Sequence, residues 1–350
     1  MTTAVLHINL QALVNNWQAL HAKSGSATET AAVVKADGYG LGAAQIAKAL
    51  YDKGAKTFFV AAAEEGEAVR SVCRDATIYV FSGYMPADAE VYRDSQLVPL
   101  LNSPAQWQQW HADMGSRAFG VQLDSGMNRL GFEADEFSKI ANDAQQAQLL
   151  VSHLACSDEP QHAMNRQQLQ AFHQMTDDVV RHAAVPRSLA ATGGVLLGAD
   201  YHFDMVRPGV GLYGGLPFAD AHPVIRLSLP VIQTRSVIKG ETVGYGGTWC
   251  ASRDTRVATL AAGYADGIIR ALGNGTESLY LYADGVACPM VGRVSMDMLT
   301  VDVTALENEP ETLDLICEFQ SIDDVAALAG TIGYEILTAC GNRYRRIFTS

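Results

Sequence analysis

Short apolar runs alternate with stretches of helical periodicity through the first two thirds of this 350-residue chain, and this alternation constrains the fold most strongly. Each run has the length of one buried strand, and helical stretches such as residues 163–182 separate the runs. Strand and helix alternating over about 220 residues is typical of parallel β-α units, which predicts a closed (β/α)8 barrel. The runs cover residues 31–34, 57–61, 77–81, 97–101, 118–123, 149–153 and 188–191.

The pattern changes near residue 223 to short β-rich runs separated by glycine turns, which is typical of an antiparallel sheet. The chain length also suits two domains of about 150 residues each. We therefore predict an α/β protein with a barrel domain over residues 1–228 and a mostly antiparallel β domain over residues 229–350. The β-rich runs are residues 230–239, 256–262, 279–282, 286–291 and 298–303.

Composition excludes several classes of protein. Apolar residues make up 48% of the chain and charged residues 18%, which is typical of a globular protein. The net charge of −13 argues against nucleic-acid binding, which needs clustered lysine and arginine. Six cysteines without CxxC pairs predict reduced thiols and no metal site. Without an export signal or a membrane-spanning segment, a cytoplasmic protein with no membrane partner is expected.

Lys35 ends the first apolar run and opens a turn, residues 36–42, that contains three glycines and a tyrosine. Burial at the end of a strand lowers the pKa of a lysine, and the neutral amine can condense with an aldehyde. Taken alone, Lys35 also fits a solvated lysine where a strand reaches the surface. Because glycines let the backbone approach a phosphate, the combination favours pyridoxal phosphate attached to Lys35.

Other polar segments fall where barrel strands are expected to end: residues 124–129, His153, 192–194 and 207–211. Catalytic groups of such barrels lie at the carboxyl ends of the strands. These positions therefore predict one active site around Lys35.

Eight segments, in order along nearly the whole chain, resemble the signatures of alanine racemases. The first, Val33–Gly40, is similar to the cofactor-lysine signature of that family. The others are Asp124–Gly131, Ser152–Asp158, Met205–Gly214, Tyr245–Trp249, Ala262–Gly267, Ser295–Met298 and Gly333–Leu337.

This resemblance implies a racemase that uses pyridoxal phosphate and interconverts L-alanine and D-alanine, for cell-wall peptidoglycan or for alanine catabolism. Racemisation removes the α-proton from one face and returns it on the other, so two bases on opposite faces suffice. By resemblance these are Lys35 and Tyr264. The family takes the tyrosine from the partner subunit, which implies a homodimer with shared active sites.

The resemblance also assigns the remaining site residues. His153 would orient Tyr264, because a phenol with an ordinary pKa near ~10 needs a neighbour to act as a base. Arg207 would face the pyridine nitrogen of the cofactor. Arg129 would contact the phenolic oxygen of the cofactor and the substrate carboxylate, and the Met296 N–H would bind the same carboxylate. The phosphate would be held by Tyr39, Thr192, Gly209, Val210 and Tyr334.

Two positions depart from the family pattern. Gln122 stands where many alanine racemases carry a lysine that carbon dioxide converts to a carbamate, which steadies the arginine corresponding to Arg129. We expect the Gln122 amide oxygen to accept a hydrogen bond from Arg129, more weakly than a carbamate would. Ala191 stands where the family commonly has asparagine and offers no side-chain hydrogen bond.

Three alternatives remain open at this point. One is a racemase of different or broader specificity, for example for serine. Another is a non-catalytic protein that binds pyridoxal phosphate, although such proteins resemble the barrel alone. A decarboxylase of related architecture fits less well, because the cysteine and aspartate of its second domain have no counterpart near residues 295–297.

Overall fold

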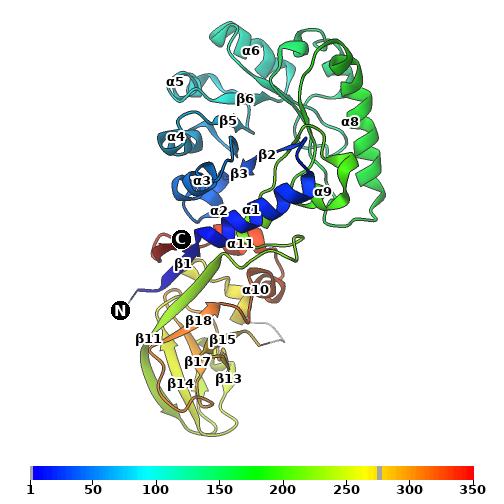
Figure 1. The fold of residues 1–350 in the computed structure, drawn as a ribbon. Helices are drawn as coiled ribbons and strands as arrows, with labels where there is room; N and C mark the ends of the chain where they lie inside the picture. Colours follow the sequence, from blue (N-terminus) through cyan, green and yellow to red (C-terminus); the bar gives the residue numbers. More distant parts are fainter. Residues whose placement is uncertain (1–2, 274–277) are drawn as a thin grey trace. The chain divides into compact units, whose positions relative to one another are not determined.

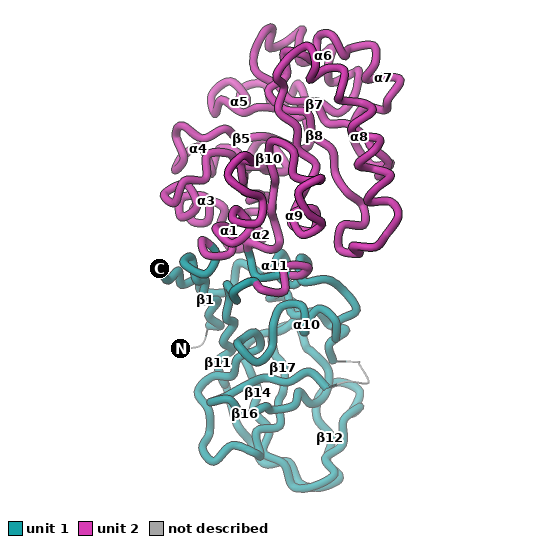
Figure 2. The backbone as a smooth tube through the Cα atoms, turned by 45° about the vertical axis from the view of Figure 1, so that its right-hand side comes forward, with its two compact units in different colours: residues 1–13, 213–215, 221–350 teal, residues 14–212, 216–220 magenta. Residues whose placement is uncertain are grey.

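The structure is a computed structural model that describes residues 3–273 and 278–350 and divides into two compact units, coloured separately in Figure 2. Unit 1 consists of Met1–Leu13, Tyr213–Gly215 and Ala221–Ser350. Unit 2 consists of Val14–Leu212 and Leu216–Asp220.

Unit 2 is built around short parallel strands. Seven of them pair in sequence order, and all of their pairings are parallel. Strands such as β4 and β6 are buried along their whole length, as expected where helices cover the outside of a parallel sheet. The seven are β3 (Ala32–Val33), β4 (Thr57–Val60), β5 (Thr77–Val80), β6 (Val98–Leu101), β7 (Gly120–Gln122), β8 (Leu150–Val151) and β9 (Arg187–Ser188).

An eighth strand, β10 (Met205–Val206), closes the barrel. On one side it pairs in parallel with β2 (Glu29–Thr30), which leads into β3. On the other side the Arg207 N–H donates to the carbonyl of Ala190, just after β9, at 2.8 Å. Since β10 is bonded to both ends of the seven-stranded sheet, unit 2 is a (β/α)8 barrel, and the predicted fold is confirmed.

Helices connect successive strands, and Figure 1 shows α3 to α6 on the outside of β3 to β6. The third helix buries Ala43, Ile46, Ala47 and Leu50, the spacing of one apolar helix face. The helices are α1 (Leu10–Ser24), which runs from unit 1 into unit 2, α2 (Lys35–Tyr39), α3 (Ala43–Tyr51), α4 (Ala63–Val72), α5 (Ala89–Asp94), α6 (Pro104–Met114), α7 (Ala134–Ser138), α8 (Ala163–His182) and α9 (Thr192–Leu197).

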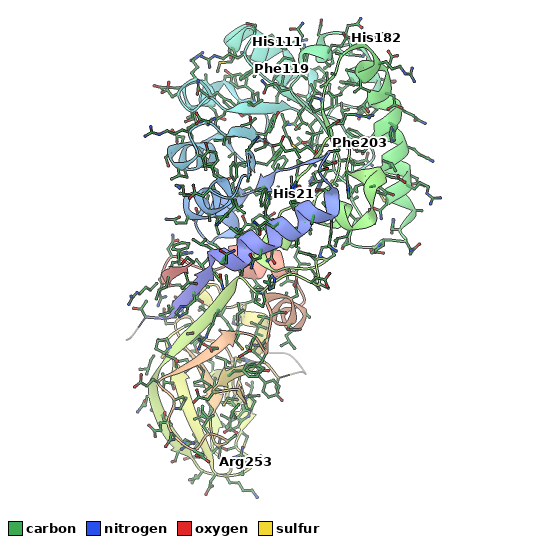
Figure 3. All side chains as sticks on the ribbon, in the orientation of Figure 1. His21, His111, Phe119, His182, Phe203 and Arg253 are labelled. Atoms are coloured by element: carbon green, nitrogen blue, oxygen red, sulfur yellow. The ribbon has the colours of Figure 1, made fainter. Side chains whose placement is uncertain are left out.

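Aromatic side chains hold the helices to the loops of the barrel. Phe203, labelled in Figure 3, lies edge-on to Phe172 of α8 with 5.1 Å between ring centroids. The Arg187 guanidinium lies 4.7 Å from the centroid of the Phe203 ring. Helix α8 is thereby fixed to the segment that precedes β10.

Unit 1 contains an eight-stranded sheet with the order β16-β15-β18-β11-β1-β19, in which β14 pairs with β11 and with β17. All of its pairs are antiparallel except β1 with β19. The strands are β1 (Val5–Asn9), β11 (Ile225–Val237), β14 (Thr255–Leu260), β15 (Tyr280–Ala283), β16 (Val286–Pro289), β17 (Leu299–Asp302), β18 (Thr312–Ile316) and β19 (Arg345–Thr349). A separate hairpin, β12 (Thr242–Val243) with β13 (Trp249–Cys250), and helices α10 (Ile322–Ala329) and α11 (Gly333–Thr338) complete the unit.

The division into units differs from the predicted boundary between residues 228 and 229. That boundary falls inside β11, a continuous strand. The first strand, β1, also belongs to unit 1, because it pairs with β11 and with β19. These partners lie more than 200 residues away along the chain, so local periodicity does not reveal them.

Among the described residues, no helix is long and apolar enough to cross a membrane. The same residues contain no group of three His, Cys, Asp or Glu side chains placed to hold a metal ion. All six cysteines are free.

Candidate active site

Lys35 lies where β3 ends, at the carboxyl edge of the barrel strands. The four residues that follow it all have left-handed backbone angles, with φ values of 53° at Ala36, 52° at Asp37, 63° at Gly38 and 56° at Tyr39. A left-handed helical turn costs about 1–2 kcal/mol for each residue that carries a Cβ. Such strain persists only where the surroundings fix it, and it is concentrated at functional sites.

Hydrogen bonds fix this turn. The Gly38 N–H donates to the Val34 carbonyl at 2.9 Å, and the Asp37 carboxylate accepts from the Ala43 N–H, at the start of α3, at 2.8 Å. The carboxylate of Glu65, a residue that the sequence did not single out, accepts from the Ala36 N–H at 2.7 Å. The backbone beside Lys35 is therefore held from both following helices.

The Lys35 amine lies in a partly buried environment, with Nζ 5.7 Å from the centroid of the Phe81 ring. Burial lowers the pKa of Lys35, the charge of Arg129 lowers it further, and the charge of Glu65 opposes them. A lowered pKa increases the fraction of neutral amine, the form that attacks an aldehyde or accepts a proton.

His153 follows β8 and lies within electrostatic reach of three predicted site residues. Burial lowers the pKa of His153 to about 3, and the charges of Arg207, Arg129 and Lys35 act in the same direction. The imidazole is therefore neutral at pH 7, where it can donate one hydrogen bond and accept another. The structure thus brings His153 near Lys35, Arg129 and Arg207, although Lys35 and Arg207 are about 170 positions apart in the sequence.

Gln168 of α8 holds the loop that carries His153. Its Nε2 donates to the His153 carbonyl at 2.9 Å, and its Oε1 accepts from the Ala155 N–H at 2.8 Å. Only 1% of Gln168 is exposed. A glutamine inside a helical stretch carries no sequence signal for this contact, which the sequence analysis missed.

Arg207 is buried at the end of β10, with 2% of its surface exposed. Its Nη2 donates to the Ser152 carbonyl at 2.7 Å, and its Nη1 donates to the Ser188 hydroxyl. Burial lowers the pKa of Arg207 to about 9, which leaves the guanidinium charged at pH 7. In the part of the chain that the structure describes, no carboxylate forms a salt bridge with Arg207, and its Nε donates to no residue. The geometry therefore leaves one charged donor for a ligand.

Four of the residues predicted to hold the phosphate lie together in unit 2. Thr192 begins α9, and its hydroxyl accepts from the N–H groups of Gly209 and Gly211 at 3.1 and 3.2 Å. A Cβ at Gly209 would overlap the hydroxyl of Tyr39, so only glycine permits this approach. Val210 lies between the two glycines and is buried. The hydroxyls of Tyr39 and Thr192 and the backbone of residues 209–211 are thus gathered at one place at the start of α9, with no acidic side chain among them, which is compatible with a phosphate group.

Gln122 does not make the predicted hydrogen bond with Arg129. Gln122 ends β7 and is 6% exposed, and its Oε1 has no hydrogen-bond partner among the described residues. Arg129 is exposed, in the loop that the Asp124 carboxylate stabilises through the N–H groups of Gly126 and Met127. The prediction was wrong: Gln122 is buried at the end of its strand, whereas Arg129 lies in an exposed part of the loop and forms no hydrogen bond with it. At the other departure, Ala191 precedes α9 without a side-chain cap, as predicted.

The other three predicted site residues, Tyr264, Met296 and Tyr334, belong to unit 1. The Tyr264 N–H donates to the Ser295 carbonyl at 3.0 Å, and the Ala265 N–H donates to the Met296 carbonyl at 2.9 Å. Tyr264 is 42% exposed and Met296 54% exposed. Two large, exposed residues thus lie in neighbouring loops of unit 1 that are joined by backbone hydrogen bonds. Tyr334, in the first turn of α11, is 38% exposed.

Arg343 reinforces this pair of loops. Its Nε lies 3.0 Å from Asp266 Oδ1 and its Nη1 lies 2.7 Å from Asp297 Oδ1. Asp266 is only 3% exposed, so its ion pair with Arg343 anchors the buried base of the Tyr264 loop. Tyr264 and Met296 are therefore held at a fixed spacing within unit 1.

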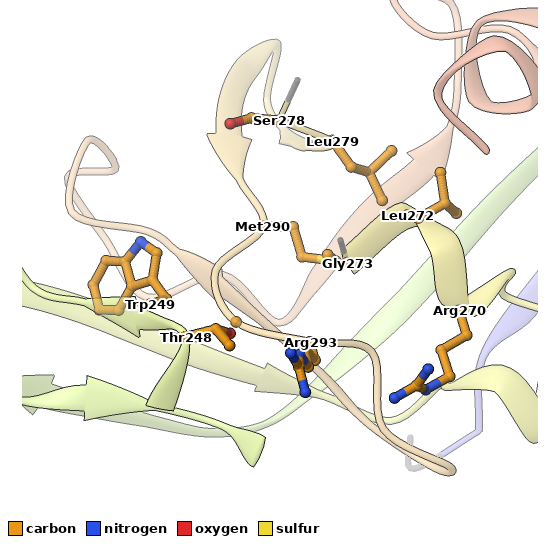
Figure 4. Close-up of a pocket in the computed structure, with 10 residues that line it drawn as sticks. Thr248, Trp249, Arg270, Leu272, Gly273, Ser278, Leu279, Met290 and Arg293 are labelled. Carbon is orange, nitrogen blue, oxygen red and sulfur yellow. The ribbon is translucent and has the colours of Figure 1, made fainter. Parts of the chain in front are cut away.

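A hollow of about 700 Å³ also opens in unit 1, drawn in Figure 4. Trp249, Arg270, Met290 and Arg293 are among its lining residues. Tyr264, Met296 and Tyr334 do not line it. This hollow is therefore distinct from the predicted site residues.

The depressed pKa of His153 predicts a loss of stability in acid. Between about pH 3 and pH 6.5 the unfolded chain binds a proton at His153 that the folded protein excludes, so the free energy of unfolding falls by about 1.4 kcal/mol per pH unit as the pH decreases. Urea unfolding of the wild type and of His153→Gln at several pH values between 5 and 7 measures this difference in slope. Equal slopes for the two proteins would refute the prediction.

The unpartnered oxygen of Gln122 predicts that a non-polar replacement stabilises the chain. A buried polar atom without a hydrogen bond costs about 1–3 kcal/mol, and methionine has a similar shape without that atom. We expect Gln122→Met to raise the free energy of unfolding by about 1 kcal/mol. Gln168→Met is the matched control, because both amide atoms of Gln168 are bonded and their loss should lower stability. The expectation fails when the two substitutions shift stability in the same direction.

Comparison with known proteins agrees with the fold and with the residues gathered in it. Residues 8–217 match the family model of the alanine racemase N-terminal domain, and residues 224–348 match that of the C-terminal domain. An alanine racemase of Dinoroseobacter shibae is 54% identical over 349 residues, which cover 99% of this chain and 98% of the relative. The alanine racemase of Rhizobium meliloti is 41% identical and covers 98% of this chain and 96% of its own length.

Solved structures give the same result. A crystal structure of alanine racemase from Bartonella henselae, with covalently bound pyridoxal phosphate, has a TM-score of 0.90 and 34% identity, and all of both chains is covered. The biosynthetic alanine racemase of Pseudomonas aeruginosa has a TM-score of 0.89 and 32% identity, again over the full length of both chains. This chain therefore belongs to the alanine racemase family, whose enzymes depend on pyridoxal 5′-phosphate.

Proposed function

We propose that this protein interconverts L-alanine and D-alanine, with pyridoxal phosphate attached covalently to Lys35. The observation that carries the proposal is the cluster of Lys35, His153 and the buried cation Arg207 at the strand ends of the barrel. The Bartonella henselae relative, which holds its pyridoxal phosphate covalently, supports the cofactor assignment. When bound, the cofactor supplies a ring that withdraws electrons from Cα and so acidifies the α-proton.

Arg207 favours racemisation over transamination. A guanidinium donates hydrogen bonds and accepts none, so Arg207 Nε can face the pyridine nitrogen only while that nitrogen is unprotonated. By holding that nitrogen unprotonated, Arg207 would limit the electron-withdrawing strength of the cofactor and so favour return of the proton to Cα. The absence of a carboxylate partner among the described residues around Arg207 agrees with this role.

Two side chains would move the proton. The neutral Lys35 amine would serve one face of Cα, and the Tyr264 phenol would serve the other. Neutral His153 would accept the hydrogen bond of the Tyr264 hydroxyl and orient it. The substrate carboxylate would be bound by Arg129 and the Met296 N–H. The phosphate would be bound by Tyr39, Thr192, Gly209, Val210 and Tyr334. Free in the described structure, Arg129 can turn toward such an anion.

The same proposal includes a homodimer in which Tyr264 and Met296 complete the site of the partner subunit. Eleven large apolar side chains among the described residues of unit 1, including those two, are at least 37% exposed, which agrees with a surface that a second protein covers. The others are Ile232, Ile238, Tyr245, Tyr280, Val286, Met298, Phe319, Ile332 and Tyr334. We further propose that the enzyme acts in the cytoplasm, in agreement with six free cysteines, and supplies D-alanine for peptidoglycan or serves alanine catabolism.

Incubation with L-alanine in deuterated water tests the activity. D-alanine should appear with deuterium at Cα in the presence of pyridoxal phosphate, and carbon dioxide should not be released. Parallel incubation with L-serine measures whether the side-chain pocket accepts a hydroxyl. Formation of neither D-alanine nor α-deuterated alanine would refute the proposal, and release of carbon dioxide would indicate a decarboxylase.

A further inference from the structure

We propose that Glu65 is the positioning residue for Lys35: its carboxylate joins the ends of β3 and β4 and thereby sets where the Lys35 amine lies. The inference rests on the proposed function only in that Lys35 is taken as the lysine that carries the cofactor. Glu65 itself touches neither substrate nor cofactor in this proposal.

The contacts of Glu65 are those of a bridge. Its Oε1 accepts from the N–H of Ala36, which directly follows Lys35, at 2.7 Å. Its Oε2 accepts from the N–H of Ala61, which directly follows β4, at 2.7 Å. Between β3 and β4 the last backbone hydrogen bond runs from the Val34 N–H to the Phe59 carbonyl at 2.9 Å. Glu65 therefore links the segments that follow β3 and β4, just beyond the last backbone hydrogen bond between the two strands.

The chemistry of this bridge requires a carboxylate. Both bonded groups are donors, so the side chain between them must offer two acceptor oxygens, and only ionised Asp or Glu does so. Hydrogen bonds to a charged acceptor are shorter and stronger than those between neutral groups, which agrees with both distances. A glutamine would keep one of these bonds and point an N–H₂ group at the other N–H.

The bridge acts on the strained backbone beside Lys35. Ala36 is the first of the four left-handed residues, and the bond from its N–H to Glu65 fixes the peptide that joins it to Lys35. Helix α4, which carries Glu65, packs against α3, at the other end of the turn, and the two helices lie next to each other in Figure 1. Without the bridge the peptide after Lys35 can rotate toward a right-handed conformation, and the Lys35 side chain moves with it.

The electrostatic effect of Glu65 on Lys35 supports this inference. Glu65 raises the pKa of Lys35 against the effect of burial and of Arg129. Loss of its charge should therefore lower the pKa of the amine in addition to freeing the backbone. The two effects can be separated. A lower pKa of Lys35 shifts the pH dependence of the rate of cofactor attachment, whereas a freed backbone lowers the maximum of that rate.

The test compares Glu65→Gln with Glu64→Gln. Glu64 is the matched control: it is exposed, lies in the same first turn of α4 and has no hydrogen bond among the described residues. Each apoprotein is mixed with pyridoxal phosphate, and the condensation of the Lys35 amine with the aldehyde, which releases one water, is followed by absorbance across a range of pH. Amide hydrogen exchange at Ala36 and Ala61, and kcat and KM for L-alanine, complete the comparison.

Glu65→Gln should slow the plateau rate of cofactor attachment by about tenfold or more and lower kcat by up to roughly 10²-fold, because a misplaced reacting group loses orientation. It should also shift the pH midpoint of attachment downward and lose exchange protection at Ala36 or Ala61. Glu64→Gln should match the wild type. Glu65→Asp, one methylene shorter, should resemble Glu65→Gln, and it replaces that variant when Glu65→Gln does not fold.

Wild-type attachment rate, kcat and exchange protection in a folded Glu65→Gln protein would overturn the inference, as would an equal loss in Glu64→Gln. Borohydride reduction of the wild type followed by peptide mapping separates this result from failure of the proposed function. A cofactor found on a lysine other than Lys35 refutes the proposed function, whereas a cofactor on Lys35 with no effect of Glu65→Gln refutes only the positioning role.

Discussion

Replacement of Lys35 by alanine should remove covalent cofactor attachment and lower kcat for racemisation by about 10⁴-fold or more. The loss combines two roles, because Lys35 is proposed both to anchor the cofactor and to carry the α-proton on one face, and proton transfer by a positioned base alone contributes roughly 10²–10⁴-fold. The chain should still fold, since a partly buried amine with a lowered pKa contributes little to stability.

Borohydride reduction, peptide mapping and stopped-time assays of D-alanine formation measure both effects. Lys48→Ala is a suitable control, because Lys48 is an exposed lysine on α3 whose partner is Asp52, one helical turn away. Lys48→Ala should leave attachment and kcat unchanged. Covalent attachment and near wild-type turnover in Lys35→Ala would place the cofactor on another lysine and exclude the assignment.

Replacement of Tyr264 by phenylalanine should lower kcat for racemisation by about 10²–10⁴-fold while Lys35 still exchanges the α-proton of one enantiomer. Phenylalanine keeps the ring and removes only the hydroxyl, so the exposed loop should retain its fold. Proton magnetic resonance of L-alanine and D-alanine incubated separately in deuterated water measures exchange without inversion. A two-base reaction in which Tyr264 serves one face would be contradicted by either of two results. One is loss of α-proton exchange with both enantiomers, and the other is normal exchange with both.

The same two variants test the shared site. Mixing Lys35→Ala with Tyr264→Phe under conditions of subunit exchange should restore about a quarter of wild-type activity, because half of the dimers are mixed and each of these has one intact site. Native mass spectrometry confirms the exchange. Mixed dimers without activity would show that Tyr264 does not act on the partner subunit.

Local sequence patterns predicted most of the barrel because strand and helix periodicity are properties of neighbouring residues. The run that ends at Lys35 became β3, and the runs near residues 57, 77 and 97 became β4, β5 and β6. His153 and Arg207 were likewise expected at strand ends, and they follow β8 and β10 at the carboxyl edge of the barrel. The pairing of β1 with β19 escaped prediction, since a strand's partner is chosen by packing across the whole chain.

The sequence by itself determined the alternation of strands and helices, the lysine at the end of the first barrel strand, and the family signatures around it. Only the tertiary structure decided how those residues are held: the left-handed turn behind Lys35, the bridge from Glu65, the amide clamp of Gln168 on the His153 loop, and the unpartnered oxygen of Gln122. The physical reason is that hydrogen-bonding side chains find partners by distance in space. A carboxylate 30 positions from Lys35, or a glutamine 15 positions from His153, acquires its role only when the barrel closes.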